Sequence, residues 1–339
     1  MTDVNRQWIM TSRPKDMVSR ENFSWQESPM PEPGDGEFLV RNLFLSFDPT
    51  MRVWMNAQDS YLPAIQIGEV MRCFSVAQVV KSNHPDYAAG ELVNGGFGWQ
   101  DYAVSNGAGP IPPSKLHPGI DPQLTMSVLG MTGLTGYFGM LDVGEVKPGD
   151  AVLVSGAAGA TGSVAAQIGR IKGARVVGMA GGEEKCRWLS EVAGLDGVID
   201  YKSEKLSKAL RQHFPKGIDL YFDNVGGPTL DAALAGLALG GRVVLCGAIS
   251  GYNSATGADG LKNYANLIVQ RGRMQGFIIL DYAKRYGEAL QELSGWVQSG
   301  DLKYQIDLQE GLENAPETFQ RIFTGANQGK QLLKVADPT

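Results

Sequence analysis

Cysteine and histidine are scarce in this chain, with three of each among 339 residues. Neither type shows the paired spacing of a disulfide framework or of a zinc lobe. The six residues are spread along the chain: Cys73, His84, His117, Cys186, His213 and Cys246. Because catalytic zinc is typically held by three protein ligands, the sequence predicts that any chemistry performed by this chain proceeds without a metal.

An excess of positive charge is also missing. The chain carries 30 Lys and Arg against 36 Asp and Glu, a net charge of −6, which argues against a nucleic-acid or anionic-membrane partner. The first ten residues contain no basic region followed by a long apolar run, so no secretory signal is apparent. The uncharged stretch 151–169 contains several glycines, which favours a buried nucleotide fold over a membrane span. We expect a soluble, cytoplasmic protein.

The composition and the hydrophobic pattern of the chain change near residue 128. The first 125 or so residues are rich in Pro and Gly with short apolar runs, which predicts a mostly β domain. Six strands are then predicted at Ala151–Ser155, Arg175–Met179, Gly197–Asp200, Asp219–Asp223, Arg242–Gly247 and Met274–Ile279. Helices are predicted at Ser163–Lys172, Glu184–Ala193, Glu204–Phe214, Pro228–Leu237, Tyr282–Gln298 and Leu312–Thr324, with a last strand at Gln331–Val335. Six strands with crossover helices make an α/β fold with a doubly wound parallel sheet, as in the Rossmann fold.

The glycine-rich run Ser155–Gly162 lies between the first of these strands and its helix. Glycines at such a turn let the backbone approach a pyrophosphate, whose charge is met by the N–H groups and dipole of the helix N-terminus. The order strand, turn, helix is the context that the motif requires. A dinucleotide cofactor is therefore predicted.

An acidic residue is absent where the second strand ends. NAD-selective folds usually carry Asp or Glu there for the ribose hydroxyls, but this chain reads Gly178–Gly182. Lys185 follows, and Tyr201 and Lys202 follow the third strand, so cationic and phenolic groups are available for a 2′-phosphate. Glu183 and Glu184 could instead reach a ribose, and the lysines could be ordinary surface charges. We favour NADP(H).

Six longer motifs resemble the medium-chain dehydrogenase/reductase superfamily, in its zinc-free branch of prostaglandin, alkenal and curcumin reductases. They lie in the expected order over almost the whole chain: Leu45–Arg52, Leu129–Gly139, Ala157–Gly162, Tyr221–Gly227, Cys246–Asn253 and Gly325–Lys330. The resemblance implies a GroES-like β-rich substrate domain, 1–127 with 300–339, and a Rossmann NADP-binding domain, 128–299. It also implies a homodimer.

The resemblance further implies a set of cofactor residues. Lys185 and Tyr201 would bind the 2′-phosphate, and Thr132 and Gly133 would lie near the nicotinamide. The rest of the NADP site would consist of Ala158, Gly159, Ala160, Thr161, Gly162, Asn224, Cys246, Gly247, Ala248, Ile249, Ser250, Tyr252, Phe277, Ile278, Ile279 and Asn327.

The chain departs from the family at Thr50, where a tyrosine that faces the substrate is usual. Thr50 and Arg52, in the first motif, are predicted substrate residues. The smaller threonine suggests a reshaped pocket, unless a neighbouring aromatic such as Trp54 or Tyr61 fills the same space.

Tyr252 is the predicted catalytic residue. Reduction of an α,β-unsaturated aldehyde or ketone requires a donor for the developing enolate oxygen, and without a metal a phenol can supply it. Whether Tyr252 or water supplies the proton for the α-carbon is left open. The alternatives are a quinone reductase of the same superfamily and a non-catalytic nucleotide-binding module.

Overall fold

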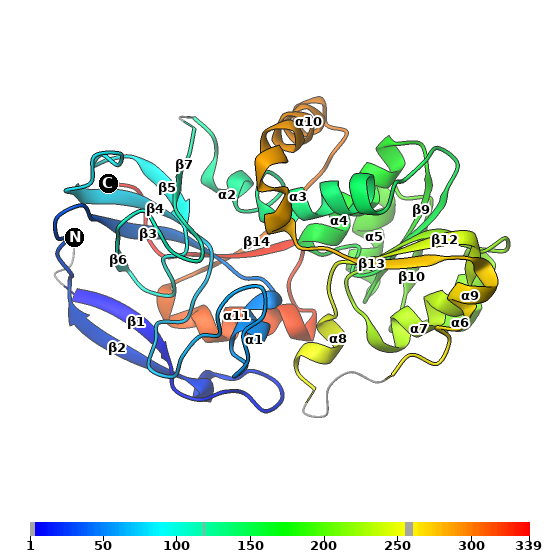
Figure 1. Ribbon diagram of the computed structural model, residues 1–339, viewed down its shortest axis with the longest axis horizontal. Coiled ribbons are helices and arrows are strands. Elements are labelled where there is room, and N and C mark those ends of the chain that lie inside the picture. The colour runs from blue at the N-terminus through cyan, green and yellow to red at the C-terminus, as the bar shows by residue number, and fades with distance from the viewer. Residues whose placement is uncertain (1–3, 118, 255–259) are drawn as a thin grey trace. The chain divides into compact units, whose positions relative to one another are not determined.

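The computed structural model describes residues 4–117, 119–254 and 260–339 (Figure 1). The chain divides into two compact units, one of Met1–Met126 with Ile306–Thr339 and the other of Ser127–Gln305. The sequence-based boundaries, 127/128 and 299/300, lie close to these divisions.

The second unit is built on a six-stranded parallel sheet with the order β10-β9-β8-β11-β12-β13. Numbered along this unit, that order is 3-2-1-4-5-6, the Rossmann order, so the predicted doubly wound fold is confirmed. The strands are β8 (Ala151–Val154), β9 (Arg175–Ala180), β10 (Gly197–Asp200), β11 (Ile218–Asp223), β12 (Leu237–Leu245) and β13 (Arg273–Gly276). Strand order reverses between β8 and β11, which is where ligands bind in such sheets.

Helices connect and cover these strands (Figure 1). They are α3 (Met131–Phe138), α4 (Ala160–Ile171), α5 (Glu183–Glu191), α6 (Leu206–His213), α7 (Gly227–Ala235), α8 (Ile249–Tyr252), α9 (Asn266–Gln270) and α10 (Tyr286–Ser299). The predicted helix at Tyr282–Gln298 is divided, since Ile279–Arg285 forms a 3₁₀ helix before α10. Apolar side chains from the helices pack on strand residues such as Leu153, Val177 and Tyr221.

The first unit is mostly β, as predicted. One sheet has the order β14-β15-β3-β4-β5-β7, with β6 also paired to β3, and β1 and β2 form a separate antiparallel pair. The strands are β1 (Val4–Met10), β2 (Phe23–Pro29), β3 (Phe38–Ser46), β4 (Ser75–Ser82), β5 (Leu92–Gly95), β6 (Tyr102–Ser105), β7 (Ser114–Lys115), β14 (Ile306–Glu310) and β15 (Lys330–Lys334). The helices are α1 (Thr50–Trp54), α2 (Pro122–Thr125) and α11 (Ala315–Thr324). β15 pairs antiparallel with β3, so the C-terminal tail completes a sheet begun near the N-terminus.

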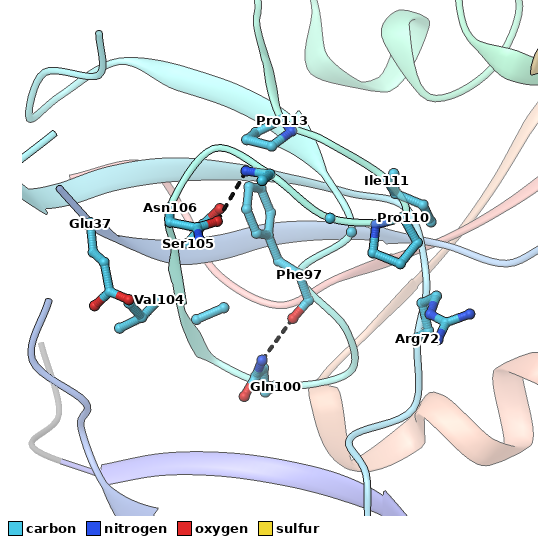
Figure 2. Close-up of a pocket in the computed structure, with 14 residues that line it drawn as sticks. Glu37, Arg72, Phe97, Gln100, Val104, Ser105, Asn106, Pro110, Ile111 and Pro113 are labelled. Carbon is cyan, nitrogen blue, oxygen red and sulfur yellow. Dashed lines mark hydrogen bonds between the residues drawn. The ribbon is translucent and has the colours of Figure 1, made fainter. Parts of the chain in front are cut away.

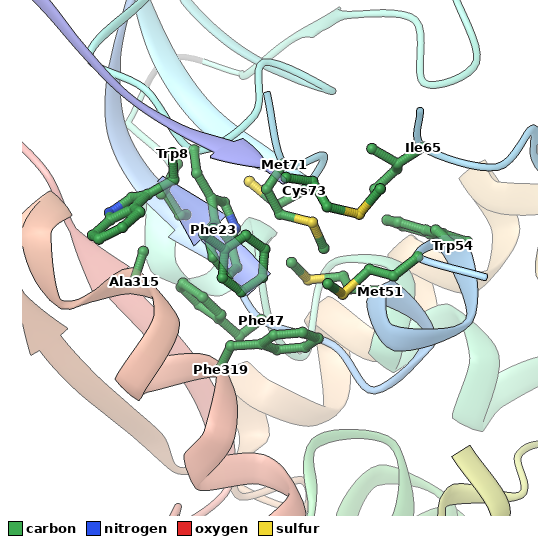
Figure 3. Packing of buried hydrophobic residues seen from close by; sticks show 14 of the residues in the cluster. Trp8, Phe23, Phe47, Met51, Trp54, Ile65, Met71, Cys73, Ala315 and Phe319 are labelled. Atoms are coloured by element: carbon green, nitrogen blue, oxygen red, sulfur yellow. The ribbon is translucent and has the colours of Figure 1, made fainter. Parts of the chain in front are cut away.

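An aromatic and methionine-rich core supports α1 (Figure 3). Met51 and Trp54 of α1 are buried in it beside Phe47 and Phe319. Phe319 lies on α11, so the tail also contributes to the core that holds this helix. Among the residues that the structure describes, no helix has the length and apolar character needed to cross a membrane.

Candidate functional site

The glycine turn after β8 has the close backbone packing that its sequence predicts. Gly156 has a φ of +58°, a conformation that glycine adopts at little cost. A Cβ on Gly162 would lie 2.2 Å from the carbonyl oxygen of Gly156, so no larger residue fits there. Gly159 caps α4, and the first amides of that helix, from Ala160 to Gly162, have no acceptor within the helix. This is a cradle suited to a phosphate group.

Tyr201 and Lys202 lie against the end of β9. A Cβ on Gly181 would lie 2.6 Å from the Tyr201 ring and 2.9 Å from Cε of Lys202, so both side chains lie against this glycine. Gly181 stands in the turn after β9, where NAD-selective folds carry an acidic residue. Lys185 lies on α5, which begins two residues after Gly181. Lys202 was considered from sequence, but it carries no role in the family resemblance.

Asp200 holds this turn in place. Its carboxylate accepts hydrogen bonds from the backbone N–H groups of Gly182 and Lys202, each at 3.0 Å. These bonds, the one from Gly182 first, hold the pKa of Asp200 below its usual range. Glu183, which could have served a ribose, is paired instead with Arg187 one turn along α5 at 2.5 Å.

Asn224 lies where β11 ends, next to the glycine turn. Its backbone N–H donates to the Ser155 hydroxyl at 3.0 Å, and its Nδ2 donates to the Ser155 carbonyl at 2.6 Å. Ser155 directly follows β8, so these bonds join the two strand ends on either side of the switch point.

The loop after β12 runs from Cys246 to Tyr252. The backbone N–H groups of Cys246 and Gly247 donate to the carbonyl of Asp223, and the Ser250 hydroxyl donates to the carbonyl of Val225. Burial raises the pKa of the Cys246 thiol to about 12, and Asp223 adds to the shift. The Cys246 thiol is therefore neutral and has a structural role in the loop rather than a nucleophilic one.

Tyr252 ends the short helix α8. Its hydroxyl oxygen accepts a hydrogen bond from the backbone N–H of Ala248 at 3.1 Å. Because donation into a phenol oxygen polarises its O–H bond, the group becomes a stronger donor. The bond holds the phenol within the loop that follows the carboxyl end of β12, and the catalytic role of Tyr252 stays a prediction.

Thr132, Gly133 and the segment 277–279 lie in the same unit. A Cβ on Gly133 would lie 1.8 Å from the carbonyl oxygen of Val128, so the close approach of α3 to this loop requires glycine. Thr132 donates from its hydroxyl to the carbonyl of Ser127 at 2.9 Å. Phe277 lies against Gly139, where a Cβ would come within 2.8 Å of its ring.

The predicted substrate residues and Asn327 lie in the other unit. The Thr50 hydroxyl is hydrogen-bonded to that of Tyr61, whereas Trp54 is buried in the core. Tyr61, of the two aromatics considered from sequence, is therefore the one beside Thr50. Arg52 is 3 % exposed and donates to the carbonyl of Pro14 at 2.9 Å and to Oδ1 of Asn56 at 2.8 Å. Nδ2 of Asn327 donates to the carbonyl of Gly329 at 3.0 Å.

Comparison with known proteins identifies the family. Residues 6–112 match a model described as the N-terminal domain of oxidoreductase, and residues 160–295 match one described as zinc-binding dehydrogenase. The chain is 43 % identical to the NADPH-dependent curcumin reductase of Escherichia coli (strain K12), over 98 % of this chain and 97 % of that protein. It is 38 % identical to the NADP⁺-dependent 2-alkenal reductase of Nicotiana tabacum, over 89 % and 88 %. The chain belongs to the medium-chain dehydrogenase/reductase family.

A solved structure of this family has the same fold over its whole length. CurA from Vibrio vulnificus in complex with NADPH superposes with a TM-score of 0.92 at 42 % identity, over 98 % of this chain and all of that one. The resemblance read from the six motifs is confirmed.

Zinc, which one family description names, does not fit the residues present. In the described part of the chain, no group of three or more His, Cys, Asp or Glu side chains could hold a metal ion. Metal independence of the reaction stays a prediction.

The pocket shown in Figure 2 lies apart from these residues in the sequence and belongs to the first unit alone. Its volume is about 360 Å³, and its lining includes Glu37, Arg72, Phe97 and Gln100. None of the predicted substrate or cofactor residues lines this pocket, so we do not assign the pocket to the reaction.

Proposed function

We propose that the chain is an NADPH-dependent reductase of the carbon–carbon double bond of α,β-unsaturated aldehydes or ketones. The observation that carries the proposal is Tyr252, a phenol whose oxygen is fixed by the Ala248 amide at the sheet edge that binds ligands. The relatives named as curcumin and alkenal reductases support it.

The cofactor preference is supported by the end of β9. The strand is followed by Gly181 and Gly182 where NAD-selective folds carry an acid, and Tyr201, Lys202 and Lys185 could bind a 2′-phosphate there. The nearby Asp200 carboxylate is engaged by the backbone N–H groups of Gly182 and Lys202, and Glu183 is paired with Arg187. The pyrophosphate would be held by the amides at the start of α4, and the nicotinamide half by Asn224, the 246–252 loop, Thr132 and 277–279. CurA from Vibrio vulnificus, solved with NADPH, supports the same choice.

When bound, the cofactor supplies a hydride for the β-carbon of the substrate. Tyr252 would then donate its O–H to the carbonyl oxygen, where negative charge develops as the enolate forms. Thr50 and Tyr61 of the first unit, joined through their hydroxyls, would contact the substrate, with Tyr61 supplying the aromatic face that Thr50 lacks. Arg52 would affect the substrate indirectly, because its guanidinium donates hydrogen bonds to the backbone carbonyls of Pro14 and Asp16 and so positions the 14–16 loop.

The reaction is tested by following NADPH oxidation at 340 nm with a panel of enals, enones and quinones. We expect turnover with enals or enones, and product analysis should show the saturated aldehyde or ketone. Turnover with quinones alone would assign the chain to the quinone reductases, and binding of NADPH without any turnover would indicate a nucleotide-binding module.

We also infer that the protein is a homodimer, formed through one edge of the second unit. Four strongly exposed apolar side chains, with exposed fractions of 60–77 %, lie on or near β12 and α9: Leu239, Tyr264, Ile268 and Val269. α9 packs on β12, next to the edge strand β13 (Figure 1). An apolar patch beside an open strand edge is typical of an interface between identical subunits.

A further inference from the structure

Asp223 is a fully buried carboxylate at the end of β11, with 0 % exposure. Its Oδ1 accepts hydrogen bonds from the hydroxyls of Tyr221 at 2.6 Å and Ser155 at 3.0 Å. It also accepts from the backbone N–H groups of Val225 at 2.9 Å and Gly226 at 3.0 Å. A buried charge is costly unless it is satisfied by such donors, so the side chains and backbone around Asp223 are arranged to suit it.

These bonds join three strand ends of the nucleotide sheet. Ser155 follows β8, and Val225 and Gly226 follow β11. The backbone carbonyl of Asp223 accepts from the amides of Cys246 at 2.9 Å and Gly247 at 3.0 Å, which follow β12. The loops after β8, β11 and β12 carry most of the predicted cofactor residues, and Asp223 contacts all three.

Asp223 holds Ser155 through its hydroxyl, and the Ser155 backbone carbonyl determines which atom Asn224 presents. The Ser155 hydroxyl donates its proton to Asp223, which leaves the lone pairs of the hydroxyl oxygen to accept a hydrogen bond from the Asn224 backbone N–H. The Ser155 carbonyl can only accept, which identifies the Asn224 atom bound to it at 2.6 Å as Nδ2. Asn224 therefore turns its Oδ1 away from Ser155. An acceptor oxygen suits a hydroxyl or amide N–H of a ligand and does not suit a phosphate.

We propose that Asp223 is a positioning residue for the cofactor: through Ser155 it sets Asn224 to accept from a hydroxyl or amide donor in the nicotinamide half of the dinucleotide. The inference rests on the proposed NADPH site. The role proposed for Asp223 differs from that of the 2′-phosphate residues in its effect on cofactor choice. NADPH and NADH share the part of the molecule that Asn224 would contact, so a change at Asp223 should affect the binding of both.

The test is Asp223→Asn, which keeps the shape but replaces one acceptor by an NH₂ group and removes the charge. Asp219→Asn is the matched control, because Asp219 lies on the same strand and accepts the Ala151 N–H of β8 at 2.8 Å. Dissociation constants for NADPH and NADH are measured by fluorescence titration, together with the melting temperature. We expect Asp223→Asn to weaken both cofactors by the same factor, about tenfold, and Asp219→Asn to leave both unchanged.

Tyr221→Phe removes one donor and retains the carboxylate, so it serves as a second variant should Asp223→Asn fail to fold. We expect it to weaken both cofactors by about threefold. Wild-type affinities in either folded variant, or a loss confined to NADPH, would overturn the positioning role. Absence of NADPH binding by the wild-type protein would instead contradict the proposed function on which the role rests.

Discussion

At the scale of single residues, Tyr252 makes the sharpest prediction. Tyr252→Phe retains the ring and removes only the hydroxyl that the Ala248 amide positions. Loss of one such donor to a developing oxyanion typically lowers kcat by about 10²–10³-fold. Steady-state kinetics with the best enone should show this loss while the dissociation constant for NADPH stays near the wild-type value. Full turnover by the variant would contradict the catalytic role.

We expect the choice between NADPH and NADH to depend on side chains around Gly181. Charge-assisted hydrogen bonds to a phosphate are worth about 1.5–3 kcal/mol, so Lys185→Ala should raise KM for NADPH about tenfold or more and leave KM for NADH almost unchanged. Lys202→Ala should act in the same direction, since Lys202 reaches Gly181. Lys205→Ala, three residues further on, is the control. Equal use of both cofactors by the unmodified protein would show that no 2′-phosphate site exists.

The Thr50–Tyr61 pair concerns substrate choice. Thr50→Tyr would add an aromatic ring to a space that Tyr61 already borders, so slim alkenals should be favoured over bulky aromatic enones. Filling a pocket changes discrimination by about 1–3 kcal/mol, which corresponds to a ten- to hundredfold change in the ratio of kcat/KM values. The ratio is measured with one linear enal and one aryl enone, and an unchanged ratio would place residue 50 outside the pocket.

At the scale of elements, a buried ion pair ties two functional segments of the first unit together. Lys330 opens β15, three residues after Asn327, and Asp48 precedes α1, which begins with Thr50. The Lys330 side chain is 2 % exposed, pairs with Asp48 and donates to the Phe47 carbonyl at 3.2 Å. Asp48 also accepts the Ser46 hydroxyl at 2.6 Å. The segment that leads into α1 is thereby fixed to the first residue of β15.

Removing one member of this pair leaves a buried charge without its partner. Asp48→Asn leaves the buried Lys330 ammonium without its partner and should lower the free energy of unfolding by about 3–5 kcal/mol. The double variant Asp48→Asn/Lys330→Met should recover most of that loss because neither charge remains. Thermal unfolding of the wild type, both single variants and the double variant measures the coupling. Losses that simply add in the double variant would show that the pair contributes no coupling energy.

The elements that could be predicted from sequence are those whose signals are local. The glycine turn, the six strands and α4 to α7 follow from apolar runs and periodicity over a few residues. β12 begins at Leu237, before the predicted Arg242, because a Gly240–Gly241 pair inside the strand resembles a turn. β14 was missed because its pattern is polar and its partner β15 lies more than 20 residues away. The Asp223 network depends on Ser155, 68 residues away, meeting the end of β11, and no local signal reports it. Tyr61 lies only 11 residues from Thr50, so sequence could name it as a candidate neighbour but could not choose between it and Trp54.

At the scale of the whole molecule, the proposed dimer depends on a patch that belongs to one unit. Burying exposed apolar side chains stabilises association by about 25 cal/mol per Å² before the costs of binding are subtracted. The wild-type protein should therefore sediment with twice the 36.4 kDa mass of one chain. Ile268→Glu/Val269→Glu should shift it to the single-chain mass, because two charges per subunit would be buried without partners.

Ile67 provides the matched control for this last prediction. It is 59 % exposed, comparable to Val269 at 62 %, but lies in the other unit and outside the patch. Ile67→Glu should leave the sedimentation mass unchanged, since a charge added there meets no partner subunit. A wild-type protein of single-chain mass at micromolar concentration would contradict the dimer, and dissociation by Ile67→Glu but not by the α9 variant would place the interface on the first unit.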